Sequence, residues 1–196
     1  STLYTNDDYA YEQVDCQVRE FARIRKMCAE DARKLVRDFR KDFAEKNDGK
    51  KISLGNLLTN FGISIEQSVQ WRNDLMRPED FLVRDEKLIS ELKILSKKYK
   101  LVCVTNNPVK PARKTLEVIG ISDFFEHIVG LDTCYKSKPA IEPFEKALKL
   151  TNSDAKNCIA IGDRFDLDIQ LPLQMGMGGF EVSGVEDLYN LHTLLK

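Results

Sequence analysis

Through the first part of the chain, apolar residues recur three and four positions apart, which places them on one face of a helix. Four such stripes follow one another between residue 8 and about residue 76, and no run typical of a strand interrupts them. Asn47-Asp48-Gly49 breaks the pattern between the second and third stripes. This part of the sequence therefore predicts four helices. The stripes are Val14, Val18 and Phe21; Ala32, Leu35, Val36, Phe39 and Phe43; Leu54, Leu57, Leu58 and Phe61; and Ile65, Val69 and Leu75.

After Pro78 the pattern changes to short, mostly apolar runs that alternate with helical stripes. Such runs are typical of strands in a buried sheet. Strands that alternate with helices form βαβ units and a parallel sheet, so we predict an α/β fold with helices on both faces of the sheet. The predicted strands are 101–104, 127–130, 157–161 and 180–182, and the last predicted helices are one from Asp168 to Met175 and one through Leu188, Leu191 and Leu195.

Polar residues stand where the first two predicted strands end, and a parallel sheet binds its ligands at that edge. Thr105 and Asn106 follow the first strand, where a hydroxyl and main-chain N–H groups near a helix N-terminus can hold an anion. The alternative is that Thr105 only caps the turn. Lys138 follows the second strand and precedes Pro139, and its ammonium can neutralise a phosphate or a developing negative charge. Lys136 fits that role equally well on the sequence alone.

The third predicted strand ends in a cluster of carboxylates. Asp163, Asp166 and Asp168 lie within six residues, directly after an apolar run and Gly162. Their mutual repulsion is costly unless a cation is present, and Mg²⁺ is a hard cation that binds carboxylate oxygens and water. The alternative is a helix N-terminus enriched in acidic residues. Together with the hydroxyl and the lysine at the other strand ends, the cluster predicts a site for a divalent cation and a phosphate.

The composition narrows the possible partners. The 196 residues include 30 basic and 31 acidic ones, for a net charge of −1, so we expect no nucleic-acid partner. No apolar stretch approaches the roughly 18 residues that span a bilayer, and we expect no membrane partner. The five cysteines are odd in number and form no CxxC pair, which favours a reduced, cytoplasmic compartment. The oligomeric state stays open, with a monomer among the options.

The order of these residues resembles the motifs of the haloacid dehalogenase superfamily. Thr105 is similar to its second motif, Lys138-Pro139 to its third, and Gly162-Asp163 with Asp168 to its fourth. The first motif of the superfamily is an Asp-x-Asp-x-Thr-type sequence at the end of the first strand. Thr2 in the opening Ser-Thr-Leu-Tyr matches the threonine of that motif. On this alignment the second aspartate directly precedes Ser1 and the first lies two residues earlier.

The resemblance implies a Rossmann-like core domain with an inserted all-helical cap. Residues 1–7 would be a remnant of the first core motif, residues 8–78 the cap and residues 79–196 the core. The Thr-Leu-Tyr start and Asn60-Phe61-Gly62 most resemble the branch that contains pyrimidine 5′-nucleotidase-like enzymes. The small phosphorylated metabolite would then be a nucleotide.

The resemblance also implies a Mg²⁺-dependent phosphatase that works by two-step phosphoryl transfer. The first of the two aspartates would attack phosphorus and form an aspartyl phosphate. The second would protonate the leaving group and then activate water. The remaining roles that the resemblance implies are substrate binding by Thr2, Thr105, Asn106 and Lys138, with Thr105 and Lys138 also catalytic, and metal binding by Asp163 and Asp168.

Other activities fit the same residues. A dehalogenase of this fold needs no metal, so the acid cluster counts against it. A phosphomutase needs a cap that holds a bisphosphate intermediate. A chain whose native form lacks the two aspartates would be a catalytically inactive binding or regulatory module. Hydrolysis of a phosphate ester with added Mg²⁺ by protein with its native N-terminus separates these alternatives.

Overall fold

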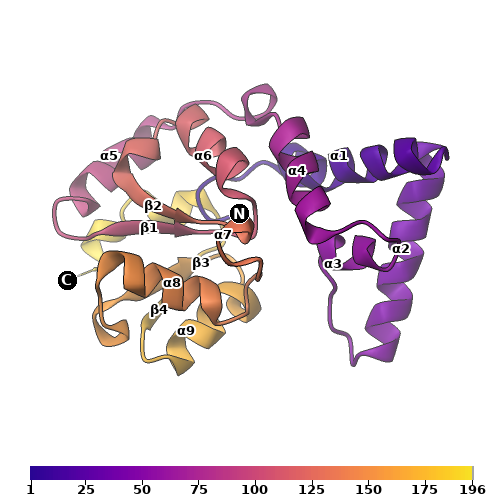
Figure 1. Cartoon of the computed structure of the whole chain (residues 1–196). Coiled ribbons are helices and arrows are strands. Elements are labelled where there is room, and N and C mark those ends of the chain that lie inside the picture. The colour runs from indigo at the N-terminus through magenta and orange to yellow at the C-terminus, as the bar shows by residue number, and fades with distance from the viewer. Residues whose placement is uncertain (196) are drawn as a thin grey trace. The chain divides into compact units, whose positions relative to one another are not determined.

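The structure, a computed structural model, describes residues 1–195 (Figure 1). The chain forms two compact units. One unit consists of residues 1–7 together with the chain from Pro78 onward, and the other is Asp8–Arg77. Over the described residues, no helix combines the length and the apolarity needed to cross a membrane.

The Asp8–Arg77 unit is all helical, as its apolar stripes predict. Ser53 and Ser64 each stand before a helix, and the side-chain oxygen of each accepts a hydrogen bond from a main-chain N–H of the first turn. These caps fix where the third and fourth helices begin, because the first N–H groups of a helix have no partner within it. The helices are α1 (Asp7–Arg25), α2 (Ala29–Lys46), α3 (Leu54–Thr59) and α4 (Ile65–Leu75).

The predicted stripes make the core of this unit. Phe21 of α1 and Leu57 and Leu58 of α3 are at most 1% exposed. Burying each of these side chains stabilises the unit by about 1.5–3 kcal/mol relative to leaving it in water. Trp71 of α4 is buried in the same cluster, so its indole ring serves packing.

A carboxylate is also buried in the helical unit. Asp15 on α1 is 3% exposed. Its oxygens accept two hydrogen bonds from Arg33 on α2, at 2.7 and 2.8 Å, and one from Arg19 at 2.6 Å. The hydrogen bonds from Arg33 outweigh the opposite effect of burial and lower the pKa of Asp15 to about 2. This charged cluster therefore ties α2 to α1.

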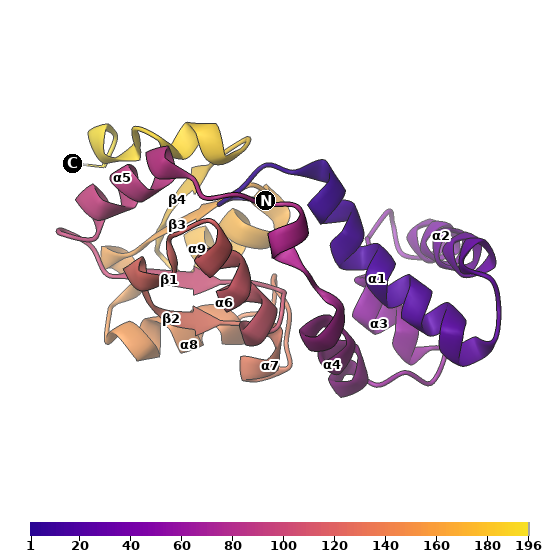
Figure 2. The ribbon, with the colours of Figure 1, turned by 90° about the horizontal axis from the view of Figure 1, so that it is seen from above.

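The other unit has the predicted α/β class. Helices lie on both sides of its strands: Figure 1 shows α6 above and α8 below the pair formed by β1 and β2, and Figure 2 shows the same elements from above. Its elements are α5 (Glu86–Leu95), β1 (Leu101–Val104), α6 (Val109–Val118), β2 (Phe125–Val129), α7 (Leu131–Cys134), α8 (Glu142–Thr151), β3 (Ile159–Gly162), α9 (Gln170–Gln174) and β4 (Gly178–Glu181).

The strands of this unit pair in parallel, as predicted, but in two separate pairs. β1 pairs with β2, and β3 pairs with β4. Within residues 1–195, β1 and β3 each have only this one strand partner. The expected parallel sheet is therefore present as two halves, each with an edge that offers main-chain N–H and C=O groups.

The predicted last helix is wrong in type. The chain after β4 instead forms two 3₁₀ helices, Val185–Leu188 and Leu191–Thr193. Leu188 and Leu191 are nevertheless buried, at 4% and 2% exposure. Leu188 ends the first of these two helices and Leu191 begins the second. Leucine spacing alone did not distinguish this geometry from an α-helix.

Removing the Asp15 carboxylate should destabilise the helical unit. Asp15→Asn keeps the size of the side chain but loses its charged hydrogen bonds to Arg33 and Arg19. We expect the free energy of unfolding, measured by urea denaturation at pH 7, to fall by about 2 kcal/mol. In the folded protein the pKa of Asp15 lies below the ordinary value of an aspartate. The advantage of the unchanged protein is therefore present above about pH 4 and is lost as the pH falls through about 2.

A matched control separates this effect from the loss of any acidic residue. Glu20→Gln removes a pair with Arg23, whose side chain is 71% exposed, and should cost no more than about 0.5 kcal/mol. Equal costs for the two variants, or a cost of Asp15→Asn that stays constant down to pH 2, would contradict the assignment.

Candidate active site

The loop after β1 is braced by the loop after β2. Thr105 follows β1, and its main-chain N–H donates to the carbonyl of Val129 at 2.9 Å. Its hydroxyl accepts a hydrogen bond from the N–H of Asn107 at 3.2 Å. Gly130 is required where the loops cross, because a Cβ atom there would lie 2.7 Å from the main-chain nitrogen of Val109. The structure thus places the predicted anion-binding Thr105 in a fixed turn at the carboxyl end of β1.

Lys138 reaches from the segment after α7 to the ends of two strands. Its Nζ donates to the carbonyl oxygen of Val104, the last residue of β1, at 2.8 Å and to Oδ1 of Asp168 at 2.6 Å. The side chains of Lys138 and Asp168 are 14% and 11% exposed, so both charges are largely removed from water. Lys136 is exposed to solvent. The structure therefore brings Lys138, and not the alternative Lys136, to the strand ends.

Asp163 follows β3 directly and contacts the beginning of the chain. The hydroxyl of Thr2 donates to its Oδ1 at 2.8 Å, and the amino nitrogen of Ser1 lies 3.3 Å from its Oδ2. Burial raises the pKa of the Asp163 carboxyl, and the hydrogen bond from Thr2 opposes burial and lowers it. Thr2 and Asp163 were predicted from separate motifs, and the structure makes them neighbours.

Asp168 lies in a π-helical turn, where the sequence predicted the start of an α-helix. Residues Phe165–Ile169 form a π-helical turn before α9, a geometry that often occurs at functional sites. The Oδ2 of Asp168 accepts a hydrogen bond from the N–H of Arg164 at 3.2 Å. A Cβ atom at Gly162 would lie 2.2 Å from the Cβ of Asp168. Only glycine at this position allows the carboxylate to fold back over the end of β3.

The three carboxylates of this strand end have different partners. Asp166, 65% exposed at its side chain, pairs with Arg164 at the surface, whereas Asp168 pairs with Lys138. Over residues 1–195, no group of three or more histidine, cysteine, aspartate or glutamate side chains is arranged to hold a metal ion. A Mg²⁺ site needs only one or two carboxylates when water and phosphate oxygens complete it. The donor set around Asp163 fits that pattern, and the metal-binding roles of Asp163 and Asp168 stay predictions.

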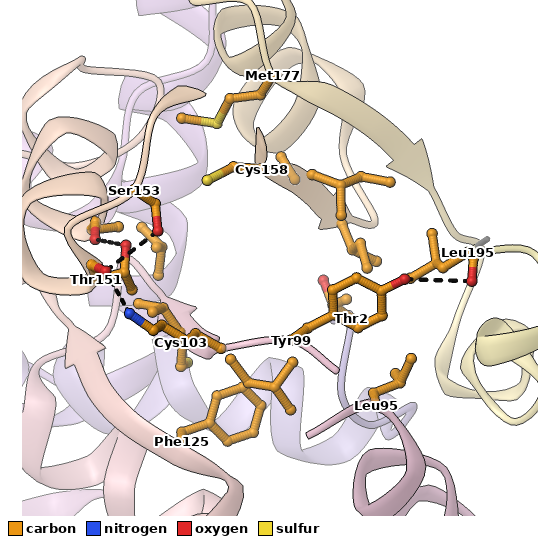
Figure 3. A pocket seen from close by; sticks show the side chains of 18 of the residues that line it. Thr2, Leu95, Tyr99, Cys103, Phe125, Thr151, Ser153, Cys158, Met177 and Leu195 are labelled. Atoms are coloured by element: carbon orange, nitrogen blue, oxygen red, sulfur yellow. Dashed lines mark hydrogen bonds between the residues drawn. The ribbon is translucent and has the colours of Figure 1, made fainter. Parts of the chain in front are cut away.

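A cavity of about 750 Å³ opens between β1 and β3. Figure 3 shows Cys103 of β1 and Phe125 of β2 on one side of it and Cys158 and Met177 across from them. Burial raises the pKa of the Cys103 thiol to about 11, so this side chain lines the wall uncharged at neutral pH. The walls are mostly apolar, and three predicted site residues also line the cavity: Thr2, Lys138 and Asp168.

One contact of the site was not visible in the sequence. Asn106 was predicted to bind substrate through its amide. In the structure its side chain makes two hydrogen bonds to the main chain of Lys138, at 2.7 and 3.2 Å. The two residues are 32 positions apart, and no periodicity connects them, so only the fold reveals the pairing.

The sequence profile of the haloacid dehalogenase-like hydrolases matches residues 2–176. The chain therefore belongs to this hydrolase family, as the order of Thr105, Lys138 and Asp163 indicated. Among curated relatives, the glyceraldehyde 3-phosphate phosphatase of Pyrococcus abyssi is 41% identical over 80 residues, which are 40% of this chain and 33% of that protein. The chain spans less than half the length of the curated relatives it matches.

Solved structures show the same fold. A haloacid dehalogenase phosphatase from Thermococcus onnurineus superposes with a TM-score of 0.64 at 19% identity, covering 100% of this chain and 94% of that one. The hydrolase YfnB from Bacillus subtilis, solved bound to magnesium, gives a TM-score of 0.58 at 15% identity, covering 95% and 93%. At these identities the likeness shows the fold alone.

The buried pair of Lys138 and Asp168 should be strongly coupled. Lys138→Met leaves the Asp168 carboxylate without its cation, and we expect the free energy of unfolding in urea to fall by about 3 kcal/mol. Adding Asp168→Asn to Lys138→Met should recover part of this loss, because it removes the unpaired carboxylate. The double variant should therefore lose less free energy of unfolding than the two single variants lose together, by at least about 1 kcal/mol.

The exposed Lys136 supplies the control for this cycle. Lys136→Met should change the free energy of unfolding by less than about 0.5 kcal/mol. Costs of the two single variants that simply add would show that the Lys138–Asp168 contact contributes nothing to stability.

Proposed function

We propose that this protein is a Mg²⁺-dependent phosphatase that hydrolyses a small phosphorylated metabolite. The observation that carries the proposal is the largely buried ammonium of Lys138 at the ends of β1 and β3, with the Thr2–Asp163 pair at the end of the same strand β3. Phosphoryl transfer depends on positioning the phosphoryl group and on neutralising its negative charge. The residues at the ends of β1 and β3 provide fixed hydrogen-bond donors and a positive charge for these two tasks. Membership of the hydrolase family and the similarity to a phosphatase support the same class.

In this proposal the residues at the strand ends bind the phosphoryl group. Thr105 and the main-chain amide of Asn106 would donate hydrogen bonds to its oxygens beside the start of α6, where the helix dipole adds positive potential. Lys138 would balance negative charge on the phosphate and on the attacking carboxylate. The hydrogen bond from Thr2 would hold the Asp163 carboxylate in place as a ligand for Mg²⁺.

The nucleophile would be the first aspartate of the Asp-x-Asp-x-Thr-type motif whose threonine is Thr2. The second aspartate of that motif is expected directly before Ser1, and the first two residues earlier. The amino nitrogen of Ser1 lies 3.3 Å from Asp163, so a residue bonded to Ser1 would lie next to that carboxylate. The nucleophile would attack phosphorus and form an aspartyl phosphate as the bond to the leaving oxygen breaks. The second aspartate would protonate the leaving oxygen and later take a proton from the attacking water.

Mg²⁺, where bound, would neutralise charge on the phosphoryl oxygens. Of the residues in this chain, Asp163 would hold the ion directly and Asp168 would orient its water ligands. We further propose that the Asp8–Arg77 unit, one residue shorter than the predicted cap of residues 8–78, forms the inserted cap and that the rest of the chain forms the catalytic core. The resemblance of the cap to the pyrimidine 5′-nucleotidase-like branch makes a nucleotide the first substrate to test.

We also propose that the chain leading to Ser1 runs as a strand between β1 and β3. The cavity lies between these two strands, and Thr2 lines it together with Lys138. The strand edges there offer N–H and C=O groups that a further parallel strand can pair with on both of its sides. Such a strand would join the two halves into one sheet. A structure of the protein with its native N-terminus and no strand in this cavity would contradict the proposal.

Protein with its native N-terminus should hydrolyse p-nitrophenyl phosphate when Mg²⁺ is present and stop when the metal is chelated. Lys138→Ala and Asp163→Ala each remove a charge that acts on the transferring group, and kcat/KM should fall by at least about a thousandfold. Release of p-nitrophenol measures both effects.

Lys136→Ala serves as the matched control, because it removes an exposed lysine from the same segment. Its kcat/KM should stay within about twofold of the unchanged protein. Absence of turnover by the unchanged protein would overturn the proposal and favour a non-catalytic binding module.

A further inference from the structure

The side chain of Asn106 makes hydrogen bonds to both main-chain polar groups of Lys138, its N–H and its C=O. Its Oδ1 accepts a hydrogen bond from the N–H of Lys138 at 2.7 Å, and its Nδ2 donates to the carbonyl oxygen of Lys138 at 3.2 Å. A carboxamide carries one acceptor and one donor group in a plane, so it can bond both the N–H and the C=O of a single residue. Exchange of the oxygen and nitrogen of Asn106 would break both bonds, which fixes the orientation of the amide.

The segment around Lys138 has little other support for its main chain. Pro139 carries no N–H, and the N–H of Ala140 donates within the segment to the carbonyl of Ser137, at 3.0 Å. Within residues 1–195, the hydrogen bonds of the Lys138 main chain both go to Asn106. The asparagine therefore fixes where this residue lies relative to the end of β1.

Fixing the main chain of Lys138 also fixes its ammonium. The Nζ donates to Val104 and to Asp168 at 2.8 and 2.6 Å, which uses two of its three N–H groups. Among the described residues, the third N–H has no hydrogen-bond partner, so it remains for an anionic oxygen at the strand ends. A displacement of about 1 Å at the main chain would break these short bonds, because hydrogen bonds weaken steeply outside a narrow range of distance and angle.

We infer that Asn106 is a positioning residue: its side chain holds Lys138 so that the ammonium meets the phosphoryl group, and it acts on the reaction through that lysine. The inference rests on the proposed phosphatase function and adds a role to it. A direct contact between the Asn106 side chain and the substrate is the competing explanation. The two differ in whether the effect of Asn106 depends on the presence of the Lys138 ammonium.

A kinetic double-mutant cycle distinguishes them. In protein with its native N-terminus and Mg²⁺, Asn106→Ala should lower kcat/KM for p-nitrophenyl phosphate by about thirtyfold, because the lysine is no longer held in place. In the Lys138→Ala background the same change should lower it by no more than about threefold. In the Lys136→Ala background, the matched control, the full thirtyfold loss should return.

An equal loss in all three backgrounds would overturn the inference and assign the Asn106 side chain to the substrate. Asn106→Ser repeats the cycle if Asn106→Ala does not fold, because serine is too short to span both main-chain groups of Lys138.

The same cycle on the dissociation constant of inorganic phosphate, measured by calorimetry, does not need turnover. If the unchanged protein binds phosphate but hydrolyses no ester, the phosphatase proposal fails, and the calorimetric cycle alone decides the role of Asn106. If esters are hydrolysed and the losses are independent of Lys138, the phosphatase proposal stands and the positioning role fails. If the unchanged protein neither binds phosphate nor hydrolyses esters, both fail.

Discussion

The ammonium of Lys138 is the contact on which the arrangement of the site depends. It donates to the carbonyl of Val104 at the end of β1 and to Asp168 in the turn after β3. These strands belong to two different pairs, so one side chain connects the carboxyl ends of both halves of the sheet. From the segment before α8, this charge contacts both the end of β1 and the turn after β3.

A pair of this kind contributes little to stability on balance. Removing a lysine and a carboxylate from water costs several kcal/mol for each, and their attraction in the interior returns about the same amount. Apolar side chains of similar size would fill the space at no such cost. We therefore interpret the pair as a means of holding a positive charge at a defined point, where an ordinary surface lysine such as Lys136 would move freely in solvent.

The sequence predicted those parts of the fold that depend on local periodicity. The four helices of the Asp8–Arg77 unit follow from stripes such as the one that contains Leu57 and Leu58, because one helical face must be buried. The strand ends at Thr105 and Asp163 followed from short apolar runs with polar residues behind them.

Features that depend on contacts between distant segments were not predictable in this way. Leu188 and Leu191 are buried as expected, but in two separate 3₁₀ helices instead of one α-helix. The turn at Asp168 depends on the space above Gly162. The pairing of Asn106 with Lys138 has no local signal at all, since it joins two loops that only the folded sheet brings together.

The cavity and the charged edge complement each other. The walls of the cavity come from the apolar faces and edges of β1 and β3. The polar lining of the cavity includes Thr2, Lys138 and Asp168. The carboxyl ends of β1 and β3 meet at Lys138, so a strand parallel to both would bury its apolar residues between them and end at the ammonium. A residue at the end of such a strand would be held by hydrogen bonds on both sides, and a nucleophile needs that rigidity to approach phosphorus in line. A strand in the gap between β1 and β3 would thus place the nucleophile where Lys138 and Asp163 can act on it.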